Sequence, residues 1–181
     1  SLNTVKTVIE KIKKAKRPVF YAGNGIRLSG GFDDFRIAVE KLGIPVCTYW
    51  DAIDLLETEH PLYVGRGGNM GDRPGNFAVQ NADLVLAVGN RLPIRVGGYI
   101  WKTWAREAEV IMVDIDPAEL RKPTIHVEMP VHADAKDFFE QVNKLLADEK
   151  EPAFKGNDWI KICQDWKKRY PACLQRHKDE N

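Results

Sequence analysis

Short apolar runs alternate along this chain with segments in which apolar residues recur every three or four positions. The runs are too short for buried helices, and polar or glycine residues bound them, which is typical of strands buried on both faces of a parallel sheet. The predicted strands are residues 18–22, 44–49, 63–64, 83–88, 110–113 and about 127–131.

The periodic segments between these runs predict amphipathic helices. Gly43 follows one of them as a C-terminal cap, Pro74 opens another, and Asp134 with Asp137 forms a capping pair for the last core helix. The first predicted helix begins behind Asn3-Thr4 and buries Val5, Val8, Ile9 and Ile12. The other predicted helices are about 32–42, a short segment from Pro74, about 99–105, and a segment from Asp134 to Leu146.

Regular alternation of strands and helices implies right-handed crossovers and a parallel sheet. The fold class that we predict is α/β, a doubly wound, Rossmann-like six-stranded sheet with strand order 3-2-1-4-5-6 and flanking helices. In that order the first and fourth strands lie side by side where the winding reverses. Ligands of open α/β sheets bind at this switch point, beyond the carboxyl ends of the strands.

The chain divides into a predicted domain over residues 1–148 and a terminal segment over residues 149–181. The glycine-rich loop 65–71 inside the first part cannot hold a helix, so we expect it to be mobile or to hold a ligand. After a charged linker, Trp159, Cys163 and Trp166 lie on one face of a predicted helix. This face either meets a further domain of a larger protein or folds back on its own domain.

Composition narrows the class of protein. The chain has 181 residues, with 27 Lys and Arg against 26 Asp and Glu, so a net charge of +1 gives no reason to expect nucleic acid as a partner. Three widely spaced cysteines without a CxxC pair argue against a disulfide framework or a zinc site, and a reducing cytoplasm is the simplest setting. No apolar run approaches the roughly 20 residues of a membrane span. The chain lacks a signal-peptide pattern and an initiator Met, which suits a piece of a longer protein.

Small and polar residues at three strand ends suggest a nucleotide site. Glycine lets the backbone approach a diphosphate, helix N–H groups and arginine neutralise its charge, and carboxylates accept hydrogen bonds from ribose or adenine. Glycines also form ordinary turns, however, and residues 114–119 could simply begin a helix. The predicted nucleotide-contacting residues are Gly23, Asn24, Gly25, Gly71, Arg91, Arg95, Asp114 and Asp116. We predict no catalytic residue and no metal ligand among them.

Several common sites are absent from the sequence. The glycines after residue 22 fit the dinucleotide fingerprint poorly, and the second strand ends in Thr48-Tyr49-Trp50 where a ribose-binding acid would stand. His60, His126, His132 and His177 have no metal-binding spacing, and the chain has neither a GxSxG elbow nor a Walker loop.

From about Thr4 to Leu146 the chain resembles the central domain of thiamine-diphosphate-dependent enzymes of the acetolactate synthase type. The order and spacing of several short segments carry the resemblance. They are Arg17-Pro18-Val19, Gly23-Asn24-Gly25, Leu42-Gly43-Ile44-Pro45-Val46, Gly68-Asn69-Met70-Gly71, Asn76-Phe77-Ala78-Val79, Asn81-Ala82-Asp83, Gly89-Asn90-Arg91, Arg95-Val96 and Asp114-Ile115-Asp116-Pro117-Ala118-Glu119.

The resemblance implies a three-domain parent enzyme that decarboxylates a 2-keto acid such as pyruvate and transfers the two-carbon unit. Its N-terminal domain would activate thiamine diphosphate, and its C-terminal domain would hold the diphosphate through Mg²⁺ with a Gly-Asp-Gly motif that this chain lacks. The central domain is then a scaffold that holds FAD in a non-redox role, ADP, or nothing. By this interpretation the chain is inactive alone, its partners are the other two domains, and the full-length parent is a homo-oligomer.

Two departures from the family bear on the flavin. Flavin-binding members place an aromatic residue and two acids between the arginines after the fourth strand, where this chain has Leu92-Pro93-Ile94. The glycine loop keeps Gly68 and Gly71 but has Asn69-Met70 in place of Met-His. FAD binding is therefore a hypothesis that depends on contacts outside the motif.

Two other functions remain open from the sequence. A stand-alone NAD-dependent enzyme, deacetylase-like or deoxyhypusine-synthase-like, would share the sheet but would need a catalytic His or Lys in its cleft, with His60 as the only candidate. A structural interaction module with a decayed nucleotide site would have its cleft filled by side chains.

Overall fold

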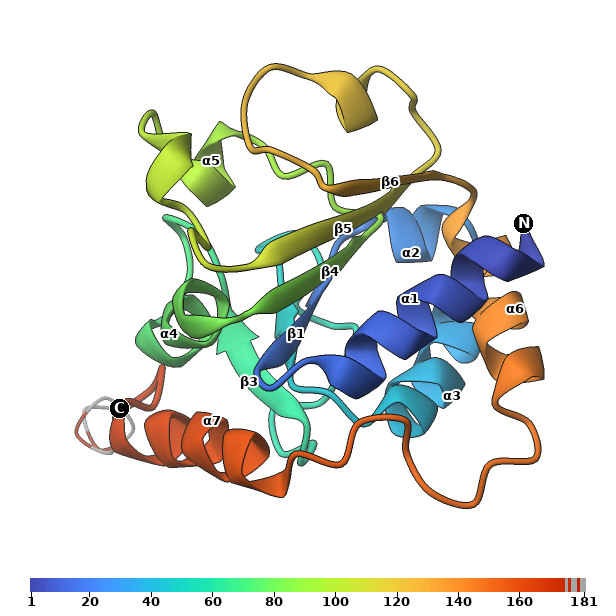
Figure 1. Cartoon of the computed structure of the whole chain (residues 1–181). Coiled ribbons are helices and arrows are strands. Elements are labelled where there is room, and N and C mark those ends of the chain that lie inside the picture. Colours follow the sequence, from blue (N-terminus) through green and yellow to red (C-terminus); the bar gives the residue numbers. More distant parts are fainter. Residues whose placement is uncertain (175, 177–178, 180–181) are drawn as a thin grey trace.

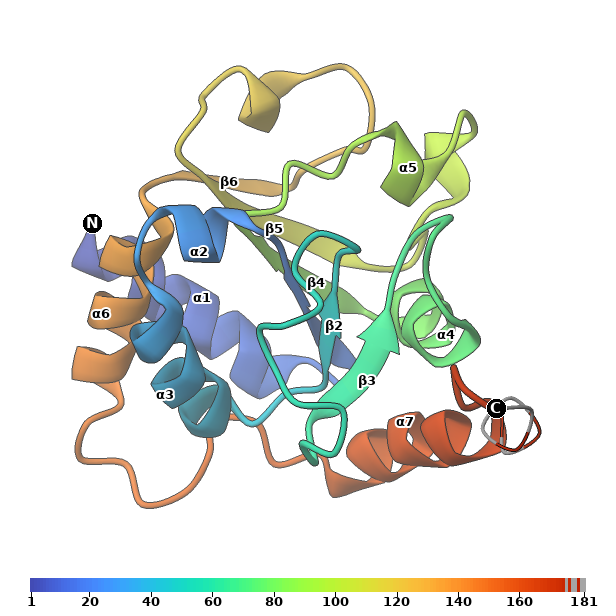
Figure 2. The same ribbon diagram turned by 180° about the vertical axis from the view of Figure 1, so that it is seen from behind.

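A computed structural model describes residues 1–174, 176 and 179, and its centre is a six-stranded sheet with helices on both faces (Figures 1 and 2). The strands run in the order β3-β2-β1-β4-β5-β6 and every neighbouring pair is parallel, which confirms the predicted topology. The strands are β1 (Pro18–Ala22), β2 (Val46–Thr48), β3 (Tyr63–Arg66), β4 (Leu84–Val88), β5 (Glu109–Asp114) and β6 (Met129–His132).

The two central strands are apolar along their whole length because both of their faces are covered. Every residue of β1 and β4 is buried, and the two strands pair in register from Pro18 with Leu84 to Ala22 with Val88. Side chains that alternate between the two faces therefore all meet a helix layer, so no polar face is needed.

Three helices cover one face of the sheet and lie together in both views of the ribbon (Figures 1 and 2). Phe35 and Phe139 pack from this layer against Phe20 of β1 and against each other, and Phe138 packs against Phe139, with ring centroids 5.4 to 6.0 Å apart. The helices are α1 (Leu2–Lys14), α3 (Phe32–Leu42) and α6 (Ala135–Leu145).

The ends of these helices follow their local sequence. Gly43 ends α3 in the left-handed conformation, with φ 67°, and Asp134 caps α6 by accepting a hydrogen bond from the Lys136 N–H, both as predicted. The first helix begins earlier than predicted, because the Ser1 side chain caps it before Asn3.

The opposite face is covered by α4 (Arg73–Asn81) and α7 (Asn157–Arg169). The indole Nε1 of Trp159 donates to the Pro18 carbonyl at 3.0 Å, Cys163 is fully buried, and the Trp166 ring packs against Phe77 of α4. The apolar face of this helix therefore folds back on the chain's own domain, which is one of the two alternatives left open by the sequence.

The loops around the carboxyl ends of the strands differ most from the prediction. Only a single 3-10 turn, η1 (Trp101–Thr103), forms in the segment 99–105 that was predicted as a helix. Trp104 stacks on Tyr21 with an extended backbone, so packing outweighs helix periodicity there. Gly65 and Arg66 continue β3 because they pair with Cys47 and Thr48 of β2. Three further short turns are α2 (Gly25–Leu28), α5 (Ile94–Gly97) and η2 (Glu119–Arg121).

None of the helices in the described part of the chain has the length and apolar character needed to cross a membrane.

Candidate functional site

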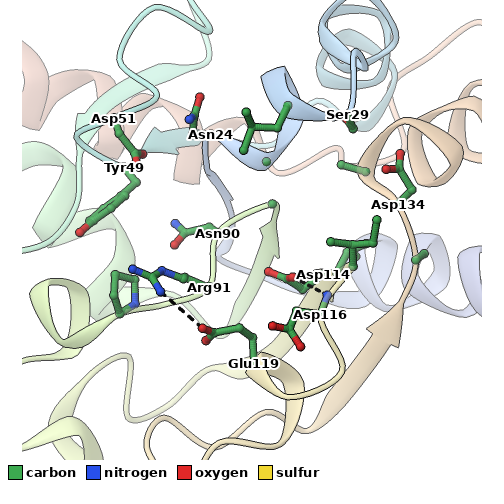
Figure 3. A pocket seen from close by; sticks show the side chains of 18 of the residues that line it. Asn24, Ser29, Tyr49, Asp51, Asn90, Arg91, Asp114, Asp116, Glu119 and Asp134 are labelled. Atoms are coloured by element: carbon green, nitrogen blue, oxygen red, sulfur yellow. Dashed lines mark hydrogen bonds and ion pairs between the residues drawn. The ribbon is translucent and has the colours of Figure 1, made fainter.

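A cleft of about 810 Å³ opens beyond the carboxyl ends of β1 and β4, where the winding of the sheet reverses (Figure 3). Its walls come from the segments that follow β1, β2, β4, β5 and β6, so residues far apart in the sequence meet there. This volume lies in the range of ligand pockets, roughly 300 to 1,000 Å³.

Two glycine turns meet at the base of this cleft. The Gly25 N–H donates to the Gly89 carbonyl at 2.9 Å, and a Cβ on Gly25 would lie 2.6 Å from the Gly89 Cα. A Cβ on Gly23 would lie 2.2 Å from the Gly89 oxygen. The turns after β1 and β4 can approach this closely only because neither carries a side chain at these points.

Six of the eight predicted residues line the cleft, and two do not. Gly23 lies beneath it in the contact between the two turns. Gly71 lies in the loop after β3, where its N–H donates to the Gly68 carbonyl and a Cβ would lie 2.4 Å from the Arg66 oxygen. The predicted residues in the lining are Asn24, Gly25, Arg91, Arg95, Asp114 and Asp116.

The glycine-rich loop 65–71 is tied to α4. Asn76 accepts from the Gly68 N–H and donates to the Gly68 carbonyl, both at 3.0 Å. Asp72 accepts from the Arg66 N–H at 3.1 Å. These bonds give the glycines a structural role in the turn, and none of residues 65–71 lies in the lining of the cleft.

Arginine side chains supply the positive charge of the cleft. Arg91 follows β4, and its Nη1 lies 3.6 Å from a Glu119 carboxylate oxygen. Arg95 lies over the Trp50 ring, with its guanidinium carbon 5.8 Å from the ring centre. Guanidinium groups of this kind can bind phosphate oxygens in pairs.

Carboxylates outnumber these arginines in the lining, and several already accept backbone hydrogen bonds. Asp114 accepts from the Asp116 N–H at 2.9 Å, and Asp116 accepts from the Ala118 N–H at 2.8 Å. Burial raises the pKa of Asp114, although the bond from Asp116 opposes the shift. Partial burial likewise raises the pKa of Asp51, which Arg91 opposes. These acids are suited to accept hydrogen bonds from hydroxyl or amino groups of a ligand.

Asn90 presents a polar donor that the described residues do not satisfy. Its side chain lines the cleft and is 2% exposed, and its Oδ1 accepts from the Leu92 N–H at 3.1 Å. Its Nδ2 is buried without a hydrogen-bond partner in the described part of the chain. A buried donor left unpaired costs about 1–3 kcal/mol, so an acceptor on a ligand at this point would stabilise the site.

Seven further polar or aromatic residues line the cleft outside the predicted nucleotide-contacting set. They come from the segments that follow β1, β2, β4, β5 and β6, so a wider reading of the residues after each strand end would have indicated them. They are Ser29, Tyr49, Trp50, Asp51, Asn90, Glu119 and Asp134.

A comparison of the sequence with known protein families gives a match to one family. The profile of the thiamine pyrophosphate enzyme, central domain, matches residues 5–142, which is most of the chain. The chain belongs to this family.

Relatives of this thiamine pyrophosphate enzyme central domain are large subunits of acetolactate synthase. A probable acetolactate synthase large subunit of Methanococcus aeolicus is 37% identical over 91% of this chain and 28% of its own length. The acetolactate synthase large subunit of Lactococcus lactis subsp. lactis is 34% identical over 92% of this chain and 28% of its own length. The chain thus spans little more than a quarter of these relatives.

The geometry of the cleft bears on the alternatives left open by the sequence. The lining contains neither histidine nor lysine among the described residues, although the NAD-dependent alternative needs one of them. His60 lies before β3, where it bonds Glu40 at 2.9 Å and the Leu62 N–H at 3.1 Å. The open volume of the cleft also differs from the filled cleft expected of a decayed site.

No group of three or more His, Cys, Asp or Glu side chains within the described residues is arranged to hold a metal ion.

Proposed function

We propose that this central domain holds an adenine nucleotide, FAD or ADP, in the cleft at the carboxyl ends of β1 and β4. The open cleft at the switch point carries the proposal, because it combines arginines with an unpaired buried donor. Arg91 and Arg95 would bind the phosphates, and Asp114 and Asp116 would accept from ribose or adenine. The nucleotide would serve as a structural element of the domain, without a redox role.

The parent enzyme that we propose is a thiamine-diphosphate-dependent, acetolactate-synthase-like protein. It would decarboxylate a 2-keto acid such as pyruvate and transfer the two-carbon unit to an acceptor. Thiamine diphosphate and Mg²⁺ would bind in its other domains, so the present chain should release no CO₂ from pyruvate when both cofactors are added. Such release would contradict this division of roles.

Exposed apolar side chains at the mouth of the cleft suggest where those other domains would pack. Leu28 and Ile115 line the cleft and yet are 82% and 66% exposed, and Ile94, which also lines it, is exposed as well. Apolar side chains grouped around a ligand site are typical of surfaces that a partner covers. We propose that the remaining domains of the parent cover this rim and that the full-length protein is a homo-oligomer in the cytoplasm, with Cys47, Cys163 and Cys173 free.

A thermal-shift titration of the purified chain with FAD, ADP and NAD tests the nucleotide proposal. A ligand at 100 times its Kd that binds only the folded state adds roughly 2.7 kcal/mol, which raises the Tm of a domain of this size by about 5 °C or more. We expect this shift with FAD or ADP and a smaller one in an R91M/R95M variant.

Two results would contradict the proposal. The absence of a shift with all three nucleotides would favour the purely structural module. A shift with NAD alone would favour the NAD-dependent enzyme.

A further inference from the structure

The loop that carries Arg91 has a strained backbone. Leu92 has φ 47°, which is rare for a residue with a branched side chain, and it is only 2% exposed. A conformation of this kind persists only where neighbouring groups hold it in place. The contacts around residues 90–92 therefore decide where the Arg91 side chain points.

Hydrogen bonds hold this loop on both sides of Arg91. On one side the Asn90 Oδ1 accepts from the Leu92 N–H at 3.1 Å. On the other the Lys122 ammonium donates to the Arg91 carbonyl. Lys122 comes from the segment after η2, so it joins the loop that follows β4 to the one that follows β5. Lys122 itself lies outside the lining of the cleft, on a smaller neighbouring cavity of about 230 Å³.

Glu119 lies between Lys122 and Arg91. Its Oε2 lies 2.7 Å from the Lys122 Nζ, whereas its Oε1 is 3.6 Å from the Arg91 Nη1 (the latter pair is drawn in Figure 3). The closer cation satisfies more of the carboxylate charge. Arg91, whose side chain is 69% exposed, is left with a loose ion pair and with donors that a phosphate can bind.

We infer that Lys122 is a positioning residue of the cleft: it neutralises Glu119 and holds the Arg91 carbonyl, so that the Arg91 guanidinium binds the phosphate of a nucleotide. This inference rests on the nucleotide site proposed above. Without Lys122, Glu119 would pair fully with Arg91 and compete with the phosphate. Lys122 would therefore control recognition of the phosphate group and leave recognition of the adenosine unchanged.

Calorimetric titration of the purified chain with ADP and with adenosine separates these two contributions. In K122M we expect the Kd for ADP to rise about tenfold, which corresponds to the loss of one charge-assisted hydrogen bond. The Kd for adenosine should stay within a factor of about two. K122R keeps the charge and should restore ADP binding. K122Q gives the same comparison as K122M if methionine prevents folding at this position.

A control and a double variant test the assigned cause. Lys11 also forms an ion pair of 2.7 Å, with Glu109 at the amino end of β5, so K11M removes a comparable pair away from the cleft and should bind ADP like the wild type. In the double variant E119Q/K122M the Glu119 carboxylate no longer competes for Arg91. We therefore expect it to regain most of the ADP affinity that K122M loses.

Each contrary outcome has a distinct meaning. Three outcomes would overturn only the role of Lys122 and leave the nucleotide site standing. They are equal ADP binding by K122M and the wild type, equal weakening of ADP and adenosine binding, and a double variant that binds ADP as weakly as K122M. A wild-type chain that binds neither ADP nor FAD would overturn the nucleotide site and this inference with it.

Discussion

Individual carboxylates in the cleft are tolerated because the backbone supplies donors to them. The acids after β5 are the clearest case, since Asp114 accepts from Asp116 and Asp116 accepts from Ala118. From the sequence alone, the same segment, Asp114 to Glu119, could be the start of a helix. It instead forms two local turns and a single 3-10 turn, η2, which leaves oxygens directed at the cleft.

Replacing Asp114 with Asn should stabilise the chain at neutral pH. Burial raises the folded-state pKa of this carboxyl, so its charge destabilises the folded state once the pH exceeds the raised value. Asn Oδ1 can still accept from the Asp116 N–H. We expect a gain of no more than about 0.5 kcal/mol, because solvent screens a half-exposed group.

The pH dependence distinguishes this cause from improved packing. The gain should fall as the pH is lowered through the raised pKa and vanish below the ordinary aspartate pKa of about 3.9, where both states are protonated. Urea unfolding of the wild type and D114N across this pH range measures it. D148N, which changes an exposed acid after α6, serves as the control, and a gain independent of pH would contradict the prediction.

Among the elements, β3 and α4 are joined directly by the side chain of Asp72. Asp72 caps α4 by accepting from the Gly75 N–H at 2.9 Å, and its other oxygen accepts from the Arg66 N–H at 3.1 Å. The Arg66 guanidinium also lies 3.6 Å from it. A short, glycine-rich connection can thus turn from strand to helix with its backbone groups satisfied.

The variant D72A should therefore lose about 2 kcal/mol of unfolding free energy, since it removes a helix cap and a second, partly buried acceptor together. D72N keeps one oxygen and should lose less. Urea denaturation with circular dichroism measures both, and S1A, which removes the exposed cap of α1, should cost only a few tenths of that amount. Equal stability of D72A and the wild type would show that the cap contributes nothing.

For the whole molecule, the terminal segment forms part of one helix layer. Phe154 and Trp159 are buried, and the Phe154 N–H donates to the Leu42 carbonyl, so the segment after α6 crosses the end of α3 before α7 begins. The domain boundary predicted near residue 148 thus lies inside a connected set of contacts. A parent enzyme would continue from a helix that is already packed on the sheet.

Truncation at residue 148 measures what this segment contributes. Removing these two large apolar side chains and exposing the surfaces that they cover should lower the unfolding free energy by about 3 kcal/mol. A chain that ends at Tyr170 keeps α7 and should retain most of the unfolding free energy of the full chain. If the 148-residue chain unfolds at the same urea concentration as the full chain, the segment contributes no stability, and this prediction is wrong.

Much of this molecule was determined by local sequence. The apolar runs predict all six strands and, with the alternating helices, their order, because side-chain periodicity and crossover handedness leave few arrangements. Gly43, Pro74 and Asp134 mark helix ends through their own backbone and capping preferences. The strand ends also indicate the cleft and six of its residues.

Only the tertiary structure decided which polar groups share the cleft and which glycines serve packing. Gly23 and Gly71 have the same local pattern as Gly25, yet only Gly25 lies in the lining of the cleft, whereas Gly23 and Gly71 pack against neighbouring backbone. Lys122 meets Arg91 because strands β4 and β5 are neighbours, although Arg91 is 31 positions away in the chain. Contacts of this kind depend on distances between elements, and a pattern along one segment carries no information about them.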